Sequence, residues 1–564
     1  MPQTSEIETD FLVVGSGAGG LVSAVTAAHF GADVLVIEKD AKYGGTSAMS
    51  GGGVWIPNSK NAEKVGAKDS AEEAYLYMKS MIGDEVSDER IRAYVKNAPE
   101  MLDFMQNNSH LDYQAFPYPD YYTEKPGAKE GFRTQAPNVF KGRKLGADLY
   151  KIRKQALGSL VQGKFSLTIK EARLFLVQDS GWRLTLFKVL MTYMLDIPGR
   201  LKGKMARRMT QGHALVGSLF LSLKEKGGDV WLSSPMVSLI EENGKVIGAE
   251  VDRVGTRVRV IARKGVVLAA GGFEHNAELR AKSLPNPTTP DWSVSQDSNT
   301  GDAHLAGMNL DAAVDLMEHA WWIPVVHVPG WPRPQAIFAE RSLPGLVIVN
   351  KQGKRFANEA LPYLESGMAM YSADSIPSWV VFDASFRNKY PFGPLGPGWA
   401  NPDSVIPKKV RAIVKRADTL EQLAEMIEVD AEGLKETIDR NNVFAETGVD
   451  EDFQRGEVFY DRYYGDSKNK PNPCIATISK APFYAIPLHP GDIGTKGGLL
   501  SDEFARVMNN SGQVIEGLYA IGNTSASVMG SKYLGAGATL GPAMTFGYIA
   551  ALDALGKSDR HLRS

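Results

Sequence analysis

The chain has 564 residues but a single cysteine, Cys474, and this scarcity excludes several kinds of site. One thiol forms neither an internal disulfide nor the cysteine pairs that zinc sites and CxxC redox centres require. The histidines show no metal-ligand spacing, so we interpret His275, His319 and His489 as structural and expect no metal. So little cysteine is typical of a reducing compartment, and we expect a cytoplasmic protein.

Long apolar runs and a strong net charge are missing as well. No uninterrupted run reaches the roughly 18 apolar residues of a membrane-spanning helix, so we expect none. The first apolar run is short and follows a polar start, which predicts the absence of a signal peptide. A formal net charge of -2 argues against a nucleic-acid-binding protein. The remaining class is a globular protein, long enough for at least two domains.

The charge is nevertheless unevenly distributed along the chain. Residues 141–208 contain sixteen Lys and Arg residues against four acids, interleaved with apolar side chains. This pattern predicts one or more basic amphipathic helices, inserted into the cofactor domain at about residues 135–210. Two interpretations stay open. The insertion contacts an anionic membrane surface, or it is a solvated helical lid or an oligomer contact.

The strongest motif lies in the first forty residues. An apolar run at residues 11–14 leads into Gly15-Ser-Gly-Ala-Gly-Gly20, and an Ala-rich segment and a second apolar run then end at Glu38. This order indicates a strand, a glycine turn, a helix, a second strand and an acid. The glycines permit a tight turn and close approach of a pyrophosphate to the helix N-terminus, and Glu38 is placed to bind a ribose. The motif therefore predicts a dinucleotide site.

A second loop, rich in Gly, Ser and Thr, distinguishes FAD from NAD. It runs from Lys39 through Gly44-Gly-Thr-Ser47 to Ser50-Gly-Gly-Gly53. NAD would not need this loop, whereas a buried flavin needs close backbone approach and hydroxyl donors along its ribityl diphosphate. No His or Cys lies beside residues 44–47 to form a covalent link, so we predict non-covalent FAD.

Later segments complete the predicted FAD site. A strand ends at Ala270-Gly-Gly272, Asn299-Thr-Gly-Asp302 opens a helix, and a Gly/Ala-rich segment from residue 535 starts the last helix. The N-terminus of that last helix suits the flavin pyrimidine, which gains negative charge on reduction. The predicted cofactor-binding residues are Gly15, Ser16, Gly17, Ala18, Gly19, Gly20, Glu38, Lys39, Gly45, Thr46, Ser47, Gly51, Gly52, Val237, Ala270, Gly271, Gly272, Asp302, Gly522, Asn523, Thr539 and Leu540.

These segments together resemble the fumarate reductase/succinate dehydrogenase class of flavoproteins. The resemblance implies an α/β fold: a Rossmann-like FAD-binding domain of the fumarate reductase type with an inserted α+β catalytic domain. We predict FAD-binding parts at residues 1–318 and 491–564 and a substrate domain at 319–490. Within the class the chain is most similar to the bacterial 3-ketosteroid Δ1-dehydrogenase family, through residues 51–57, 120–122, 271–276, 358–363, 461–466 and 523–527 and through Tyr533-Leu-Gly-Ala-Gly537.

Three positions favour this family over a dicarboxylate reductase. Fumarate reductases have an arginine four residues after an Asn-Glu pair, where this chain has Tyr363. Their histidine before Thr-x-Gly-Gly is Gly494 here, and no arginine lies between Tyr533 and Met544. A pocket with tyrosines in place of cationic clamps suits a neutral, apolar ring ketone.

The resemblance also implies a mechanism and a set of catalytic residues. The Tyr533 hydroxyl and the Gly537 N–H hold the C3 carbonyl, while Tyr363 removes the C2 proton and a hydride passes from C1 to flavin N5. We expect neighbours to favour the ionised form of Tyr363, because the pKa of tyrosine is ordinarily about 10. Tyr121 is expected to assist by a hydrogen bond or proton relay, with Tyr122 as its rival. The expected pocket walls are Phe338, Trp321 and Trp322.

One residue departs from the family pattern, and three alternative functions stay open. The family usually has proline after the oxyanion tyrosine, where this chain has Leu534, and we expect an altered pocket shape. The alternatives are a 3-oxo-5α-steroid Δ4-dehydrogenase, a fumarate-type reductase acting on an unknown enoate, and a non-catalytic flavin carrier docked on a membrane. The residues do not identify the electron acceptor; a quinone-like compound is one candidate.

Overall fold

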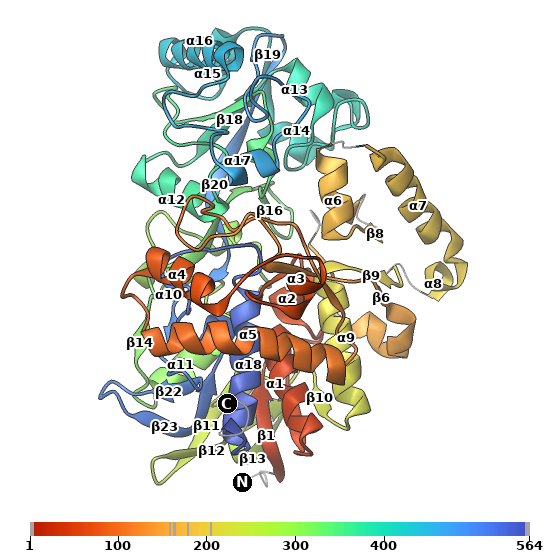
Figure 1. The fold of residues 1–564 in the computed structure, drawn as a ribbon, viewed down its shortest axis with the longest axis vertical. Helices are drawn as coiled ribbons and strands as arrows, with labels where there is room; N and C mark the ends of the chain where they lie inside the picture. The colour runs from red at the N-terminus through yellow and green to blue at the C-terminus, as the bar shows by residue number, and fades with distance from the viewer. Residues whose placement is uncertain (1–4, 157–159, 162–164, 178–179, 203–205, 559–564) are drawn as a thin grey trace.

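The glycine-rich N-terminal motif folds as the start of an eight-stranded sheet, in the lower half of the view in Figure 1. The computed structural model describes residues 5–156, 160–161, 165–177, 180–202 and 206–558. The sheet order is β10-β2-β1-β13-β12-β23-β22, with β11 paired to β12, and β10, β2, β1 and β13 pair in parallel. Its strands are β1 (Ser5–Val14), β2 (Val34–Ile37), β10 (Asp229–Trp231), β11 (Met236–Glu242), β12 (Lys245–Arg253), β13 (Thr256–Leu268), β22 (Arg506–Met508) and β23 (Val514–Ala520).

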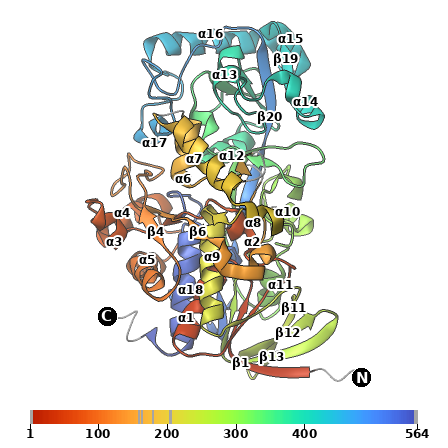
Figure 2. The ribbon, with the colours of Figure 1, turned by 90° about the vertical axis from the view of Figure 1, so that its right-hand side faces the viewer.

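Helices cover one face of this sheet, as Figures 1 and 2 show from two sides. They are α1 (Ala18–His29), α5 (Asp88–Asn108), α9 (Gln211–Glu225) and α18 (Leu540–Ala554). Small residues let α1 and α18 approach closely, because a Cβ on Gly19 would lie 2.6 Å from the Ala543 carbonyl oxygen. The first and last helices therefore pack side by side and bring the two ends of the chain to one cofactor site.

A second, antiparallel sheet lies in the upper half of Figure 1. Its order is β16-β15-β20-β18-β17, with β19 paired to β20. These strands are β15 (Ala320–Val326), β16 (Gln335–Ala336), β17 (Leu346–Val349), β18 (Ser378–Phe382), β19 (Lys415–Ala417) and β20 (Phe483–Thr495). The accompanying helices are α12 (Tyr363–Ser372), α13 (Ala384–Lys389), α14 (Lys408–Ile413), α15 (Leu420–Met426), α16 (Ala431–Thr447) and α17 (Phe459–Tyr463).

The predicted combination of an α/β region with an α+β region is confirmed. The exact domain limits stay a prediction, and the one at residues 490/491 falls inside β20. That long strand runs from the second sheet toward the first, so the chain returns to the cofactor region without a separate linker. Further short elements are α2 (Gly45–Met49), β3 (Val54–Trp55), α3 (Lys60–Lys64), α4 (Ala71–Ile82), β4 (Tyr113–Ala115), β5 (Thr134–Pro137), α10 (Ala277–Ser283), α11 (Asp302–Met308), β14 (Val314–Asp315) and β21 (Gly498–Leu499).

The insertion forms a helical segment beside both halves (Figure 1). Parts of it, residues 157–159, 162–164, 178–179 and 203–205, lie outside the described residues. The rest contains β6 (Phe140–Lys141), a 3-10 segment (Gly142–Lys151), β7 (Leu160–Val161), β8 (Phe165–Ser166), α6 (Ile169–Leu176), α7 (Trp182–Leu195), α8 (Ile197–Lys202) and β9 (Arg208–Met209). Within the described residues, no helix is both long and apolar enough to cross a membrane.

The expectation of basic amphipathic helices is wrong for α7. Within this helix only Val189 is buried, yet apolar residues occupy its outer side too, with Phe187 58% and Leu195 70% exposed. Arg183 and Lys188 are its only charged residues. An amphipathic helix turns its polar face outward, whereas most of the exposed side chains of α7 are apolar. The lysines and arginines counted in the sequence come mostly from the segments on either side.

Candidate active site

The start of α1 provides a place for a pyrophosphate. Gly17 precedes the helix without a side-chain cap, residues 18–20 are buried, and only the Ala18 N–H meets a side chain, donating to Ser47 Oγ at 3.0 Å. Gly15 has φ +111°, and a Cβ there would lie 2.3 Å from the Ala269 carbonyl oxygen. A buried helix N-terminus has amide donors without intrahelical partners, which suit a phosphate group. These residues therefore fit the diphosphate of FAD.

Glu38 lies where the motif predicts it, at the end of β2, and is buried. Its carboxylate accepts bonds from the Ser16 hydroxyl at 2.5 Å and from the Asp40 N–H at 2.9 Å. Burial raises the pKa of Glu38, and the Ser16 hydroxyl opposes this shift. The Ser16 hydroxyl also accepts the Gly44 N–H at 2.9 Å, so it joins the two glycine loops. An acid held this way fits the ribose of FAD.

The other predicted cofactor segments converge on the same end of the sheet. Residues 270–272 follow β13, and the Gly271 carbonyl accepts the Thr524 hydroxyl at 2.9 Å, which joins them to the turn after β23. Thr539 directly precedes α18 and, like Gly17, provides no side-chain cap for its helix. We call the set formed by residues 15–20, 38–52, 270–272, 522–523 and 539–540 the FAD cradle.

Three predicted cofactor residues have other partners or lie at the edge of the FAD cradle. Lys39 and Asp302 form an ion pair with each other at 2.7 Å. Val237 is exposed on β11, at an irregularity in the pairing of β11 with β12. The contacts of Lys39, Asp302 and Val237 with FAD therefore remain predictions. The two glycine loops, in contrast, are joined by the hydrogen bonds of Ser16.

Three tyrosines from distant parts of the sequence meet in one buried cluster. Tyr121 lies between β4 and β5, Tyr363 is the first residue of α12, and Tyr533 lies in the turn before α18. The Tyr121 hydroxyl donates to the Tyr363 hydroxyl at 3.1 Å. The rings of Tyr121 and Tyr533 are stacked at 5.3 Å, and the Tyr363 ring meets the Tyr533 ring at 5.0 Å edge to face. We call these three residues the tyrosine cluster.

Gly537 completes the arrangement. It has φ +96°, and a Cβ would lie 2.5 Å from the Val54 Cα, so only glycine fits this turn. Burial raises the pKa of Tyr533, while hydrogen bonding to Tyr363, to Thr539 and to the Gly537 N–H opposes this rise. The two expected donors thus lie close together in one turn.

The expectation that neighbours favour ionised Tyr363 is only partly met. Burial raises the pKa of Tyr363 well above its ordinary value, and the negative charge of an ionised Tyr533 would raise it further. Among the main influences, the hydrogen bond from Tyr121 acts in the opposite direction. In the surroundings formed by the protein alone, Tyr363 is therefore a neutral phenol near neutral pH.

Two of the three expected wall residues reach the tyrosine cluster. The ring of Phe338 meets Tyr363 at 5.4 Å, and the ring of Trp321 meets Tyr533 at 4.9 Å. The indole N–H of Trp321 donates to Asn523 Oδ1 at 3.0 Å, which links the cluster to the FAD cradle. The expectation is wrong for Trp322, whose ring packs on Tyr371, because consecutive residues of a strand point to opposite faces.

The structure also distinguishes Tyr121 from Tyr122, the alternative candidate for the helper role. The hydroxyl of Tyr122 donates to Glu365 on α12, away from the Tyr363 hydroxyl. A further aromatic residue, Tyr460, contacts the Tyr121 ring at 4.9 Å and was missed by the sequence reasoning. Its only signal was its place directly before the 461–466 segment.

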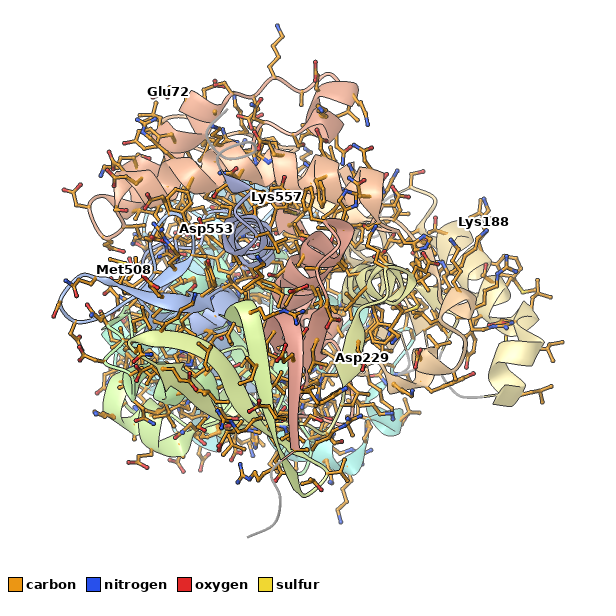
Figure 3. All side chains as sticks on the ribbon, turned by 90° about the horizontal axis from the view of Figure 1, so that it is seen from below. Glu72, Lys188, Asp229, Met508, Asp553 and Lys557 are labelled. Carbon is orange, nitrogen blue, oxygen red and sulfur yellow. The ribbon has the colours of Figure 1, made fainter. Side chains whose placement is uncertain are left out.

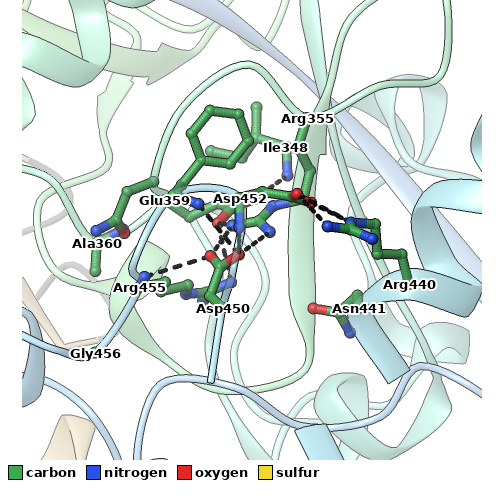
Figure 4. Close-up of polar contacts among 12 residues, drawn as sticks. Ile348, Arg355, Glu359, Ala360, Arg440, Asn441, Asp450, Asp452, Arg455 and Gly456 are labelled. Atoms are coloured by element: carbon green, nitrogen blue, oxygen red, sulfur yellow. Dashed lines mark hydrogen bonds and ion pairs between the residues drawn. The ribbon is translucent and has the colours of Figure 1, made fainter. Parts of the chain in front are cut away.

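Buried charges hold the turn that leads to Tyr363. Glu359 pairs with Arg355 at 2.8 Å and with Arg455 at 3.2 Å, and Arg355 also pairs with Asp450 at 2.7 Å (Figure 4). Burial alone would raise the pKa of Glu359, and the two guanidinium groups hold it below its ordinary value. Removing one partner of a buried ion pair leaves the other charge unpaired and strongly destabilises the fold. These pairs therefore hold the turn rigid.

Arg341 adds a second anchor to the same turn. Its guanidinium donates to the carbonyls of Glu359 and Leu361, at 2.5 and 3.1 Å, and to that of Phe338 at 3.3 Å. It therefore ties a wall residue of the pocket to the backbone just before Tyr363. Neither anchor was predicted from the sequence.

Comparisons with known proteins agree with this geometry. The model of the FAD binding domain family matches residues 10–540. The chain is 43% identical to the 3-oxosteroid 1-dehydrogenase of Mycolicibacterium smegmatis, covering 97% of both chains. It also matches the crystal structure of 3-ketosteroid delta1-dehydrogenase from Sterolibacterium denitrificans in complex with 1,4-androstadiene-3,17-dione, with 47% identity, a TM-score of 0.94, and 97% and 99% of the two chains covered. A flavocytochrome c3 fumarate reductase shares the fold alone, with 21% identity, a TM-score of 0.64, and 99% and 79% covered.

The chain therefore belongs to the FAD binding domain family, and its fold is that of a fumarate reductase flavoprotein, as the resemblance implied. It is an oxidoreductase that uses FAD. Within that class it is a member of the 3-oxosteroid 1-dehydrogenase family, known also as the 3-ketosteroid Δ1-dehydrogenases. The predicted fold class, cofactor and family are confirmed.

Proposed function

We propose that the protein introduces a double bond between C1 and C2 of 3-ketosteroids, as a step in the breakdown of ring A. The observation that carries the proposal is the tyrosine cluster beside the Gly537 turn, with the hydroxyl groups of Tyr121 and Tyr363 3.1 Å apart. The family membership supports the same reaction. The walls of aromatic rings suit a flat, apolar, neutral substrate.

The reaction needs a stabilised negative charge on the C3 oxygen. A C–H bond next to a ketone is too weak an acid for a side-chain base unless the developing enolate is held by donors. Tyr533 and Gly537 provide one hydroxyl and one backbone N–H that already lie within reach of each other. Bound FAD would supply the acceptor for the hydrogen that leaves C1.

Tyr363 is the base that takes the C2 proton in this proposal. Its place at the first position of α12, behind the Arg341 and Glu359 anchors, fixes the direction of its hydroxyl. Tyr121 donates a hydrogen bond to that hydroxyl and stabilises its ionised form. Because Tyr363 is neutral in its resting surroundings, its hydroxyl must first release its own proton to solvent, and its phenolate oxygen then takes the C2 proton while Tyr533 and Gly537 stabilise the enolate.

An anaerobic titration of the purified flavoprotein with androst-4-ene-3,17-dione tests this function. Loss of flavin absorbance together with formation of the 1,4-diene is the expected result. If only a 5α-saturated 3-ketone reduces the flavin and yields the 4-ene, the protein is a Δ4-dehydrogenase. Absence of flavin reduction with both steroids would contradict both assignments and favour a non-catalytic flavin carrier or another substrate.

We also propose that the insertion contacts an anionic membrane surface. The exposed apolar residues of α7 and α8 are Leu184, Phe187, Leu190, Met191, Met194, Leu195, Ile197 and Leu201. Figure 3 shows the segment around Lys188 standing out at one side of the molecule. So large an apolar patch marks an interaction surface, and the flanking lysines and arginines complement anionic lipids.

The insertion also reaches the tyrosine region. On α6, the Arg173 guanidinium lies over the Tyr463 ring at 4.4 Å, and that ring contacts Tyr118 at 4.8 Å. A membrane-bound insertion would hold a cytoplasmic enzyme close to steroids dissolved in the lipid and to a quinone-like electron acceptor. We propose these two compounds and the anionic membrane surface as the partners of the protein.

Co-sedimentation with vesicles tests the membrane contact. We expect the holoenzyme to pellet with vesicles containing phosphatidylglycerol and to bind pure phosphatidylcholine less. A Leu184→Ser/Phe187→Ser/Leu195→Ser variant should bind at least about tenfold more weakly, because about 1.5–3 kcal/mol of burial is lost per side chain. Val405→Ser/Val443→Ser, at exposed apolar residues of the other half, is the matched control. Equal binding by both variants, or no binding by the wild type, would contradict the contact.

A further inference from the structure

A second buried charge cluster surrounds Arg133. Its guanidinium donates to Asp69 at 2.9 and 2.7 Å and to Asp120 at 2.8 Å. The group lies beside the rings of Trp55 and Tyr77, at 5.6 and 5.7 Å from their centroids, and these two rings contact each other at 6.2 Å. Arg133 is 1% exposed, so one buried cation is bonded to two carboxylates and lies beside two aromatic rings.

Asp120 connects this cluster to Tyr121, the next residue in the chain. One carboxylate oxygen of Asp120 accepts the Trp55 indole N–H at 2.7 Å. The other accepts the Lys129 backbone N–H at 2.9 Å as well as the Arg133 bond. Each oxygen thus has a fixed partner, and the backbone that carries Tyr121 is held from its N-terminal side.

The same cluster holds the turn that carries Tyr533 and Gly537. The Leu534 carbonyl accepts the Tyr121 N–H at 3.0 Å and the Tyr77 hydroxyl at 2.7 Å. A Cβ on Gly535 would lie 2.6 Å from the Trp55 indole. The two aromatic residues beside Arg133 are therefore the ones that contact this turn.

We propose that Arg133 is a positioning residue that fixes the Tyr121 hydroxyl relative to the oxyanion donors Tyr533 and Gly537. We call Asp69, Arg133, Asp120 and Trp55 the Arg133 clamp. It touches no reacting group and acts through the backbone on both sides of the pocket. The proposal rests on the proposed function, because these donors act on ring A there.

The clamp should affect turnover more than steroid binding. A misplacement of about 1 Å can cost about 100-fold in rate, whereas apolar contacts provide most of the affinity for a ligand of this kind. Lysine cannot replace arginine here, since a single ammonium group does not reproduce a forked bond to Asp69 together with a bond to Asp120.

Steady-state kinetics of Arg133→Lys with androst-4-ene-3,17-dione test the proposal. We expect kcat to fall about 30-fold while KM stays within about twofold, with flavin content unchanged. The matched control is the same substitution at Arg92, which lies over the Tyr75 ring at the surface of α5 and should keep wild-type kinetics. Asp69→Asn leaves the bond between Arg133 and Asp120 in place, and we expect about a fivefold lower kcat at unchanged KM.

Two results would overturn the clamp. In one, Arg133→Lys keeps wild-type kcat; in the other, kcat, KM and flavin content worsen together, which indicates only a destabilised fold. If Arg133→Lys does not fold, an unchanged kcat in Asp69→Asn overturns the proposal instead. A wild-type enzyme that leaves every 3-ketosteroid unchanged would overturn the proposed function, and the clamp with it.

Discussion

The FAD cradle and the tyrosine cluster meet at Trp321, but different atoms form their binding surfaces. The FAD cradle presents mainly backbone amides, from glycine loops at Gly15 and Gly44 and from uncapped helix starts. The tyrosine cluster presents side-chain hydroxyls from three segments more than 100 residues apart in sequence. A backbone site depends on the absence of side chains, whereas a hydroxyl site depends on the anchors behind each side chain.

This difference predicts which substitutions abolish FAD binding and which lower kcat. In the FAD cradle an added Cβ collides with fixed backbone at Gly15, Gly19, Gly20 and Gly52, so the loss of FAD binding should be complete there. In the tyrosine cluster the effect of a substitution should depend on the distance between the altered group and the reacting atoms. Removing the base, Tyr363, should lower kcat most. Changing Leu534, which contributes only its carbonyl oxygen, should lower kcat least.

Gly15→Ala should abolish FAD binding. The new methyl group would lie 2.3 Å from the Ala269 carbonyl oxygen, at a φ of +111°. Flavin absorbance per protein after purification measures the loss. Gly31→Ala is the control, because Gly31 also has positive φ but has nothing within 4 Å of an added Cβ. It should cost about 1 kcal/mol of stability and keep FAD. Retained FAD in Gly15→Ala would contradict this account of the FAD cradle.

Tyr363→Phe should lower kcat by about 1000-fold and leave FAD in place, because it removes the base and nothing else. Stopped-flow flavin reduction by androst-4-ene-3,17-dione measures the effect. A variant that still reduces its flavin at a tenth of the wild-type rate would show that another group takes the proton.

The pH dependence of kcat/KM should reflect the raised pKa of the buried Tyr363. Burial raises the pKa of Tyr363 well above 10, and only the ionised form can accept a proton. We therefore expect kcat/KM to rise with pH, by about tenfold per unit between about pH 7 and 9, without a plateau. A plateau starting near neutral pH would mean that FAD or a bound steroid lowers this pKa far below its value in the protein alone.

Tyr121→Phe should lower kcat by about 30-fold, since the hydrogen bond to Tyr363 is lost but the base remains. Tyr122→Phe should stay within about threefold of wild type, because Tyr122 bonds Glu365. Comparing the two kcat values measures the helper role directly. The reverse order would assign that role to Tyr122.

Leu534→Pro should have the smallest effect, within about threefold in kcat. The bonds that hold this residue use its carbonyl oxygen, which proline keeps, and proline removes only an N–H. A kcat lowered about tenfold or more would show that the turn depends on the freedom that leucine gives it.

The sequence predicts the FAD cradle better than the tyrosine cluster for physical reasons. The 15–20 loop acts through local backbone conformation, so Gly15 and Glu38 can be read from spacing alone. Tyr363 and Tyr533 came from a family resemblance, because long-range packing leaves no local signal. Their anchors escaped prediction altogether: a buried Arg133 or Arg341 looks like a surface arginine until its partners are placed around it.

The most direct test of the account is the structure of the holoenzyme with androsta-1,4-diene-3,17-dione. We expect the C3 oxygen within about 3 Å of both the Tyr533 hydroxyl and the Gly537 nitrogen, with C2 as the carbon nearest the Tyr363 hydroxyl. A steroid bound in the opposite direction, with its C17 oxygen at Tyr533, would contradict the assignment. So would a C3 oxygen that reaches neither donor.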